Sequence, residues 1–449
     1  MPKTRFIVTF EVNIDDQGAN VNEILSAVGQ ARDAAGVALA EAVIEWQQQW
    51  LRDCLCGRDR QAKKGMGGHA EKRRPGRRCG VRSFIKEGFR PAKRTVRTQL
   101  GEIAFRVGYV RCRTCGGKFS PLLDVLGLAS HAGHAGSLER EVVEATARTS
   151  FRRAVGEIGG LRGVPVSRSS SHRWAAGLKL PEAKPPPLQL LMGDGTGYKK
   201  RRGRRGELRV AIGVTADGCV VPLGTWSGRS WRQIAAQLKR RLPKKARPAL
   251  AVTDGEKGLD DHFASLARRA QRSRWHLLRD FRVLLWHDGL KKAQTDPLQQ
   301  RLGGIVAVEI PEDDWKSVPP LTKERLRQRV EEARAKFQAM IDEFEELGYR
   351  QGATYLQRAK DRIFSRVELW LATGIVAPSS TGILEEIMRE LGRRVKKLGW
   401  NWGDHGITQQ ASMILLRRYS QNQWEQYWRD RLGLGDHCNV EMTGIHQWN

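Results

Sequence analysis

The first part of the chain mixes strand and helix periodicities. Residues 3–11 alternate as in a strand, and residues 21–52 place apolar side chains at the spacing of one helical face. Two further strands are expected over residues 94–100 and 102–109, joined at Gly101. The pattern therefore predicts an opening helix followed by a short β segment.

Three short helical segments come next, over residues 138–149, 152–158 and 167–179. Glycines and a Gly-Val-Pro sequence separate the last two segments, which is typical of a helix-turn-helix. Prolines at position 181 and at positions 185–187 then predict a stiff linker.

Beyond this linker the pattern alternates between strands and helices. Three strands come first, over residues 188–192, 207–214 and 219–224. A helix, a strand, a helix and a short strand follow, over residues 231–242, 249–252, 259–268 and 274–277. Three antiparallel strands followed by this alternation is the order expected of an RNase H-like sheet.

From residue 281 to residue 378 the pattern is helical throughout. Apolar side chains step by three and four as in a coiled hairpin, at Leu326, Val330, Ala333, Phe337, Met340, Ile341, Phe344 and Leu347. No strand pattern returns afterwards. Glu385 is therefore expected on a helix over residues 383–398, with Ser379, Ser380 and Thr381 as capping candidates.

These patterns predict an α/β fold with six parts. They are an N-terminal strand and helix (1–52), a basic region that resembles a zinc ribbon (53–135), a helix-turn-helix domain (136–180), the first part of an RNase H-like core (188–280), an all-helical insertion (281–378) and the C-terminal region with the Glu385 helix (379–449).

The net charge adds a class of partner to this picture. Lysine and arginine number 78 against 49 aspartates and glutamates, a formal charge of +29 at pH 7. Nucleic acid is the favoured polyanion, because neutralising its phosphates releases condensed counterions. The first residues lack a secretory signal, and no apolar run reaches the roughly 18 residues of a membrane span. We therefore expect a cytoplasmic, nucleoid-associated protein that binds double-stranded DNA and no membrane.

Three basic segments are candidates for DNA contact. They are the last helix of the helix-turn-helix with Arg168, His172 and Arg173, the turn after the first core strand with Lys199, Lys200, Arg201, Arg202, Arg204 and Arg205, and the Glu385 helix with Arg389, Arg393 and Arg394. A solvated basic helix and a charged hairpin tip are the alternatives for the first two segments.

Two aspartates end apolar runs in the α/β region. Asp194 follows Leu-Leu-Met-Gly, Asp254 follows Leu-Ala-Val-Thr, and a glycine comes after each aspartate. If the two strands are neighbours, both carboxylates project into one crevice, where the glycines let backbone and substrate approach closely. An ordinary Asp-Gly turn is the alternative for either motif alone.

Carboxylates this close repel one another unless a divalent cation neutralises them, and hard oxygen ligands select Mg²⁺ or Mn²⁺. Two such ions about 4 Å apart activate the attacking oxygen and stabilise the leaving one in an in-line phosphoryl transfer. A third carboxylate is needed to complete both coordination shells. Glu385 is the first candidate, and Glu386, which points about 100° away on the same helix, is the second.

Seven cysteines are few and odd in number for this length, which favours reduced thiols or a metal site over disulfides. Cys112 and Cys115 have the spacing of a zinc knuckle. Cys54 and Cys56 are the expected partners, one residue short of the usual spacing, and Cys79 could substitute for one ligand. The alternatives are a structural Zn²⁺ site and free thiols.

The motifs around the carboxylates resemble those of bacterial insertion-sequence transposases of the DDE class, most closely the Kra-type branch and more distantly the Mutator-like group. The resemblance rests on Asp194-Gly-Thr, Thr253-Asp254-Gly, Arg274-Trp-His276-Leu, Thr381-Gly-Ile-Leu-Glu385, Arg393-Arg394-Val-Lys-Lys-Leu-Gly399-Trp-Asn-Trp402 and residues 411–418. The chain departs from that branch in having Thr381 for serine, Trp400 for methionine, and one residue fewer between the glutamate and the glycine.

The resemblance implies a transposase that binds transposon ends and target DNA, cleaves and joins strands with Mg²⁺, and acts as a homo-oligomer. It places His276 near the active site, and it implies that the helical insertion grips DNA or a partner subunit. Ordinary packing is the alternative for both features. The alternative functions are a DNA-binding regulator with a decayed core and a nuclease that cuts without joining.

Overall fold

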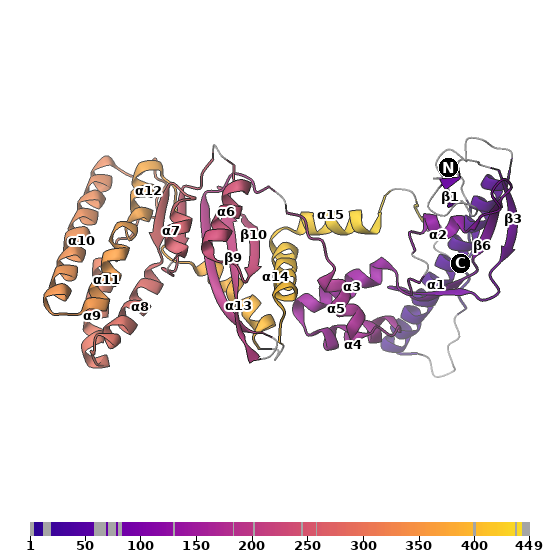
Figure 1. Cartoon of the computed structure of the whole chain (residues 1–449), viewed down its shortest axis with the longest axis horizontal. Helices are drawn as coiled ribbons and strands as arrows, with labels where there is room; N and C mark the ends of the chain where they lie inside the picture. The colour runs from indigo at the N-terminus through magenta and orange to yellow at the C-terminus, as the bar shows by residue number, and fades with distance from the viewer. Residues whose placement is uncertain are drawn as a thin grey trace. The chain divides into compact units, whose positions relative to one another are not determined.

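The computed structural model describes residues 4–11, 19–57, 69–70, 78–79, 83–128, 131–182, 184–200, 203–243, 246–256, 258–397, 401–435 and 438–441. The chain divides into an N-terminal unit, residues 1–174, and a C-terminal unit, residues 175–449. Figure 1 labels the elements of both units.

A long helix and short strands form the first part of the N-terminal unit. Helix α1 (Val21–Cys56) forms where the periodicity predicts a helix and starts at a capping box made by Asn20 and Glu23. The strands are β1 (His69–Ala70), β2 (Arg78–Cys79), β3 (Phe84–Phe89), β4 (Arg94–Thr98), β5 (Gly101–Phe105), β6 (Gly108–Cys112) and β7 (Lys118–Phe119), followed by helix α2 (Pro121–Val125). They pair as β1-β2, β3-β6-β7 and β4-β5.

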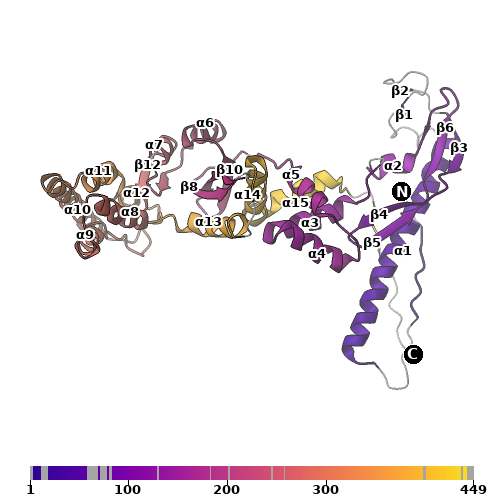
Figure 2. The same cartoon turned by 60° about the horizontal axis from the view of Figure 1, so that its bottom comes forward.

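Two buried polar side chains attach α1 to these strands, and Figure 2 shows α1 lying along them. Gln48 Oε1 accepts a hydrogen bond from Gly108 N at 2.6 Å, and Arg52 Nη2 donates to Glu87 O at 2.5 Å. The expected strand over residues 3–11 is wrong for the described residues, because residues 4–11 lie exposed and pair with no strand.

The three helices expected of a helix-turn-helix are present, as α3 (Gly136–Arg148), α4 (Phe151–Arg162) and α5 (Arg168–Ala176). Gly163 ends α4 in the left-handed region at φ 63°, a conformation that favours glycine. The helices pack around Leu138, Val142, Val164, Val155, Ile158, Val166 and Trp174.

The C-terminal unit is built on a mixed five-stranded sheet. Its strands are β8 (Leu190–Lys199), β9 (Arg205–Val214), β10 (Val220–Ser227), β11 (Leu250–Thr253) and β12 (Arg269–Arg272), in the order β10-β9-β8-β11-β12. The first three strands are antiparallel, and β11 runs parallel to both β8 and β12.

Helices cover both faces of this sheet (Figure 2). Helices α6 (Trp231–Arg241) and α7 (Leu259–Ala264) cover one face, and α13 (Gly382–Val395) and α14 (Asp404–Tyr419) cover the other. Successive side chains of β10 point to opposite faces of the sheet. Thr225 donates a hydrogen bond to Thr408 O of α14, whereas Trp226 donates one to Gln237 of α6.

The last strand of the sheet differs from the prediction. A strand was expected over residues 274–277, but those residues begin helix α8 (Arg274–His287), and β12 ends at Arg272. The buried side chains of β12 are polar: Gln271 Nε2 donates to Ile363 O at 2.7 Å, and Arg272 Nη2 donates to Gly255 O at 2.6 Å. Hydrophobic periodicity therefore carried no signal for this strand.

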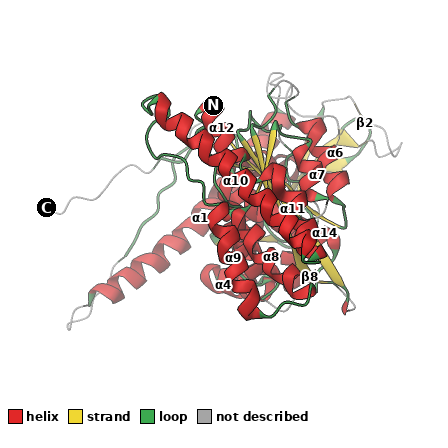
Figure 3. Ribbon diagram, turned by 90° about the vertical axis from the view of Figure 1, so that its left-hand side faces the viewer, coloured by secondary structure: helices red, strands yellow, loops and turns green. Residues whose placement is uncertain are grey.

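The expected helical segment follows as α8, α9 (Lys292–Ile305), α10 (Pro320–Glu346), α11 (Arg350–Ala359), η2 (Lys360–Arg362) and α12 (Ser365–Thr373). Figure 3 shows these helices gathered beside one another. The α10 stripe packs as predicted from Leu326 to Phe344, whereas Leu347 caps the helix and is 56% exposed. After α13 and α14 comes α15 (Gln421–Leu432). Among the described helices, none has both the length and the apolar character that a membrane crossing requires.

Candidate functional site

The sheet register brings Asp194 and Asp254 side by side, Asp194 in the middle of β8 rather than at its end, and Asp254 directly after β11. In the parallel pair of β8 and β11, Gly193 lies opposite Thr253, so the next residue of each chain segment is an aspartate. Gly193 faces α7, where a Cβ would meet Phe263 at 2.7 Å. Because side chains alternate along a strand, Asp194 faces the opposite side, which α13 covers.

Glu385 comes from the first turn of α13. Its Oε1 accepts a hydrogen bond from Thr381 Oγ1 at 3.0 Å and lies 3.4 Å from His276 Nε2. Thr381 is buried and stands one helical turn before Glu385, so it fixes the direction of the carboxylate. The sequence predicted the helix and the glutamate, but not this hydrogen bond.

Glu386 points elsewhere. It pairs with Arg418 of α14 at 2.5 Å, and Arg418 also pairs with Glu390. Its side chain is 58% exposed. Glu385, in contrast, lies beside His276, and its negative charge raises the pKa of Asp194.

The buried carboxylates of this group have raised pKa values. The pKa of Asp194 is raised to about 7, mainly by burial and further by the negative charges of Asp254, Glu256 and Glu385. The hydrogen bond from Gly195 N–H lowers the pKa and offsets part of this rise. Burial also raises the pKa of Asp254, while the N–H of Glu256 and His276 oppose the rise. A cation bound here would offset the free-energy cost of burying the negative charges and the repulsion between them.

Asp194, Asp254 and Glu385 do not form a group whose ligand atoms all lie within 4.8 Å of one another. Among the described residues, only a group of cysteines has three ligand atoms within 4.8 Å of one another. Two ions about 4 Å apart need a wider set of oxygens than one ion does.

His276 is a buried imidazole beside this group. Burial is the main cause that lowers its pKa, followed by Arg279, while Asp254 and Glu385 raise it. The short contact to Glu385 is an ion pair only when the ring is protonated, and the lowered pKa favours the neutral ring. Neither ring nitrogen has a hydrogen-bond partner among the described residues.

The loop after Asp254 needs its glycine. Gly255 has φ +95°, and a Cβ there would lie 2.0 Å from Arg272 Nη2. Asp254 Oδ1 accepts a hydrogen bond from Glu256 N at 2.8 Å, and Asp260 holds Arg272 at 3.4 Å. Sequence reasoning missed Arg272, Asp260 and Glu256, because their roles depend on contacts that no local pattern encodes.

The basic candidates do not all lie at the surface. The exposed ones are Arg168, His172, Arg173, Lys199, Arg204, Arg205, Arg389 and Arg393. Lys200 pairs with Asp404 at 2.8 Å. Arg394 is 3% exposed and stacks on Trp402, and burial lowers its pKa to about 10, so it is not available to DNA. Arg201 and Arg202 lie outside the described residues.

A second group of chemical interest lies in the N-terminal unit. The sulfur atoms of Cys79, Cys112 and Cys115 all lie within 4.8 Å of one another, and all three residues are buried. This cluster could hold a metal ion such as zinc. Cys54 and Cys56 are not in the group, although Cys56 is partly buried against the same apolar cluster. Cys79 therefore lies beside Cys112 and Cys115, where Cys54 and Cys56 were expected as metal ligands.

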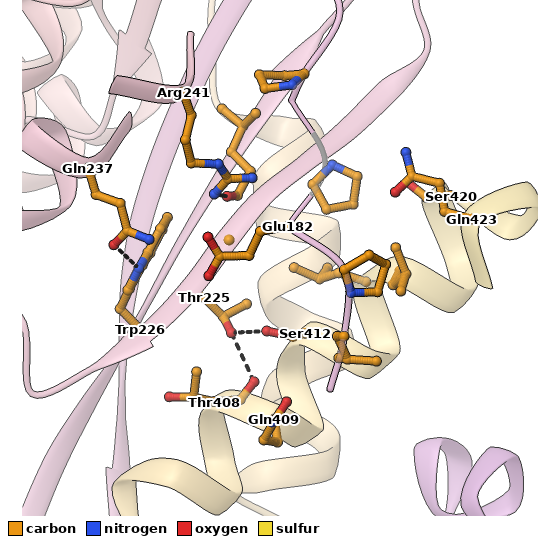
Figure 4. A pocket seen from close by; sticks show the side chains of 18 of the residues that line it. Glu182, Thr225, Trp226, Gln237, Arg241, Thr408, Gln409, Ser412, Ser420 and Gln423 are labelled. Atoms are coloured by element: carbon orange, nitrogen blue, oxygen red, sulfur yellow. Dashed lines mark hydrogen bonds between the residues drawn. The ribbon is translucent and has the colours of Figure 1, made fainter. Parts of the chain in front are cut away.

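A cavity of about 500 Å³ lies along β10 and is lined by residues of the proline linker, α6 and α14 (Figure 4). Thr225 Oγ1 bonds to Ser412 Oγ at 2.7 Å on its wall, and Glu182 of the linker projects into it. None of the three acidic candidates lines the cavity, so it is separate from the carboxylate group.

Comparison with known proteins adds no further identification. No protein-family model matches the chain, and no curated protein sequence matches it.

Proposed function

We propose that the chain is a DDE-type transposase that holds two Mg²⁺ or Mn²⁺ ions with Asp194, Asp254 and Glu385. One observation carries the proposal: neighbouring parallel strands place the two aspartates side by side, on the face where α13 presents Glu385. The sheet order β10-β9-β8-β11-β12, with two antiparallel hairpins before the parallel strands, supports an RNase H-like core.

Each residue has a separate task in this proposal. The carboxylates of Asp194, Asp254 and Glu385 bind the ions, which supply the charge stabilisation for phosphoryl transfer. Thr381 positions Glu385 through its hydrogen bond. His276 lies 3.4 Å from Glu385, and its lowered pKa favours the neutral ring, which adds no positive charge beside the ions.

Double-stranded DNA is the proposed partner, as transposon ends and as target. The exposed Arg168, His172 and Arg173 on α5 suit contact with a groove or with phosphates. Arg389 and Arg393 lie exposed on the same helix as Glu385, where they suit the substrate backbone. Assembly into a homo-oligomer follows from the resemblance to the class.

The third carboxylate gives the test of this proposal. Glu385→Gln removes a charge beside His276, whereas Glu386→Gln removes one that already pairs with Arg418. In cleavage and strand-transfer assays with Mg²⁺ and DNA carrying the element's ends, we expect Glu385→Gln to lower the rate by about 10²-fold or more, and Glu386→Gln to lower it less than about fivefold.

The outcomes separate the alternative functions. Binding of end DNA without any metal-dependent cleavage by the unaltered chain indicates a regulator with a decayed core. Cleavage without joining indicates a nuclease. Equal activity of the unaltered chain and Glu385→Gln removes Glu385 from the site.

The raised pKa of Asp194 predicts a pH dependence of stability. Between its ordinary value of 3.8 and about 7, the folded chain keeps a proton that the unfolded chain has released. The free energy of unfolding of the metal-free protein therefore falls as pH rises through this range. Mg²⁺ replaces the proton, so thermal unfolding should show a larger Mg²⁺ stabilisation at pH 8 than at pH 5. Asp194→Asn should remove most of that difference, and an equal Mg²⁺ effect at both pH values would refute the prediction.

For the cysteine cluster we propose a structural Zn²⁺ with Cys56 as the fourth ligand. Zinc sites of this kind are tetrahedral, and three buried thiols within 4.8 Å leave one position to fill. Cys56 ends α1 and packs against the same cluster, whereas Cys54 does not belong to it. The ion would then join α1 to strands β2 and β6.

A further inference from the structure

Helix α8 carries a stripe of two tryptophans with two arginines between them, Trp275, Arg279, Arg282 and Trp286. The steps of four, three and four residues place all of them on one helical face. Trp275 is 53% exposed and Trp286 is 43% exposed. We call these four residues the Trp–Arg stripe.

Each tryptophan of the stripe stacks with an arginine one turn away. Arg279 Cζ lies 4.8 Å from the centre of the Trp275 ring, and Arg282 Cζ lies 5.1 Å from that of Trp286. Such pairs keep the rings flat against a cation and leave planar surfaces at the protein exterior. Arg282 Nε has no hydrogen-bond partner among the described residues.

Core packing does not account for the stripe. The opposite face of α8 already supplies the core, through Leu277, Phe281 and Leu285, all less than 1% exposed. Large apolar rings left at the surface in a row indicate an interaction site rather than a packing need.

The stripe begins at the carboxylate group. His276, the residue after Trp275, lies 3.4 Å from Glu385. Arg279 Nε donates a hydrogen bond to Asp280 Oδ1 at 2.6 Å, and this bond, followed by the charges of Asp280 and Asp254, raises the pKa of Arg279. A strand bound along the stripe would therefore reach Asp254 and Glu385 at its Trp275 end.

We propose that the Trp–Arg stripe binds unpaired bases of the DNA strand that enters the carboxylate site. Bases stack on tryptophan rings and guanidinium planes irrespective of sequence, and the arginines and the +29 net charge complement the phosphates. This inference rests on the proposed function. A second copy of the chain is the other occupant that exposed tryptophan and arginine suit.

The test measures binding of a single-stranded oligothymidine by the full chain without added Mg²⁺ or Mn²⁺, where no metal-dependent cleavage occurs. Stacking contributes about 1–3 kcal/mol per base, so Trp275→Ala and Trp286→Ala should each weaken binding by about 5- to 150-fold. Trp286→Phe should retain most of the affinity. The dependence on salt should stay the same in all three variants, because no charge is removed.

Two control variants separate stacking from general damage. Trp50→Ala removes a tryptophan that is 39% exposed on α1, and Val283→Ala removes an exposed apolar side chain beside the stripe. Both should bind as the unaltered chain does. Unchanged affinity in the Trp275→Ala/Trp286→Ala double variant overturns the inference, as does a loss of self-association in that variant by analytical ultracentrifugation with unchanged DNA binding. Because the assay needs no catalysis, either result leaves the cleavage test of the proposed function intact.

Discussion

Asp254→Asn is expected to lower Mg²⁺-dependent DNA cleavage by about 10³-fold or more while leaving DNA binding intact. Asparagine has nearly the same shape but only a neutral oxygen to offer, and one ion-binding position is lost with the charge. The backbone around residue 254 should stay in place, because Arg272 holds Gly255 and Asp260 independently of that carboxylate. Single-turnover cleavage of labelled end DNA measures the loss.

A matched control is Asp261→Asn. Asp261 lies on α7 in the same unit, 72% exposed, and pairs only with Arg362 among the described residues. We expect its cleavage rate to remain within about twofold of the unaltered chain. Asp194→Asn should behave like Asp254→Asn. Full activity in both Asp194→Asn and Asp254→Asn is incompatible with an acidic metal site at β8 and β11.

The second large effect is expected from Cys112→Ser. Cys112 is 1% exposed and belongs to the sulfur cluster, so its loss should abolish zinc binding. Structural zinc contributes directly to folding, and we expect the thermal midpoint of the N-terminal unit to fall by ~10 °C or more. Zinc content by mass spectrometry and the unfolding midpoint measure the two effects.

Other cysteines provide the comparison. Cys219→Ser changes an exposed thiol of the C-terminal unit and should alter neither readout. Cys56→Ser should lose zinc, whereas Cys54→Ser should keep it. A full zinc content in Cys112→Ser, or a purified chain that binds no zinc, contradicts the proposed centre.

Strong local signals made much of the C-terminal unit predictable. Apolar runs that end in Asp-Gly located β8 and β11 together with their carboxylates, and a three-and-four spacing located the buried stripe of α10. Such patterns report burial, which is the property that the hydrophobic effect selects along each element.

Features that depend on polar burial were not predictable. β12 buries Gln271 and Arg272, which satisfy backbone carbonyls, and Arg394 lies beneath the surface on Trp402. In the sequence these residues look like surface positions. Cys79 was only a substitute ligand, since its approach to Cys112 brings together two residues far apart in the chain. Residues 4–11 show the reverse case, in which alternation without a partner strand forms no sheet.

The most direct measurement of the central claim is a crystal structure of the chain soaked in Mn²⁺, with anomalous diffraction to locate the metal. We predict two peaks about 4 Å apart between the carboxylates of Asp194, Asp254 and Glu385, and none at that place in Asp254→Asn. Manganese bound elsewhere, with these three side chains free of it at millimolar concentration, would contradict the assignment.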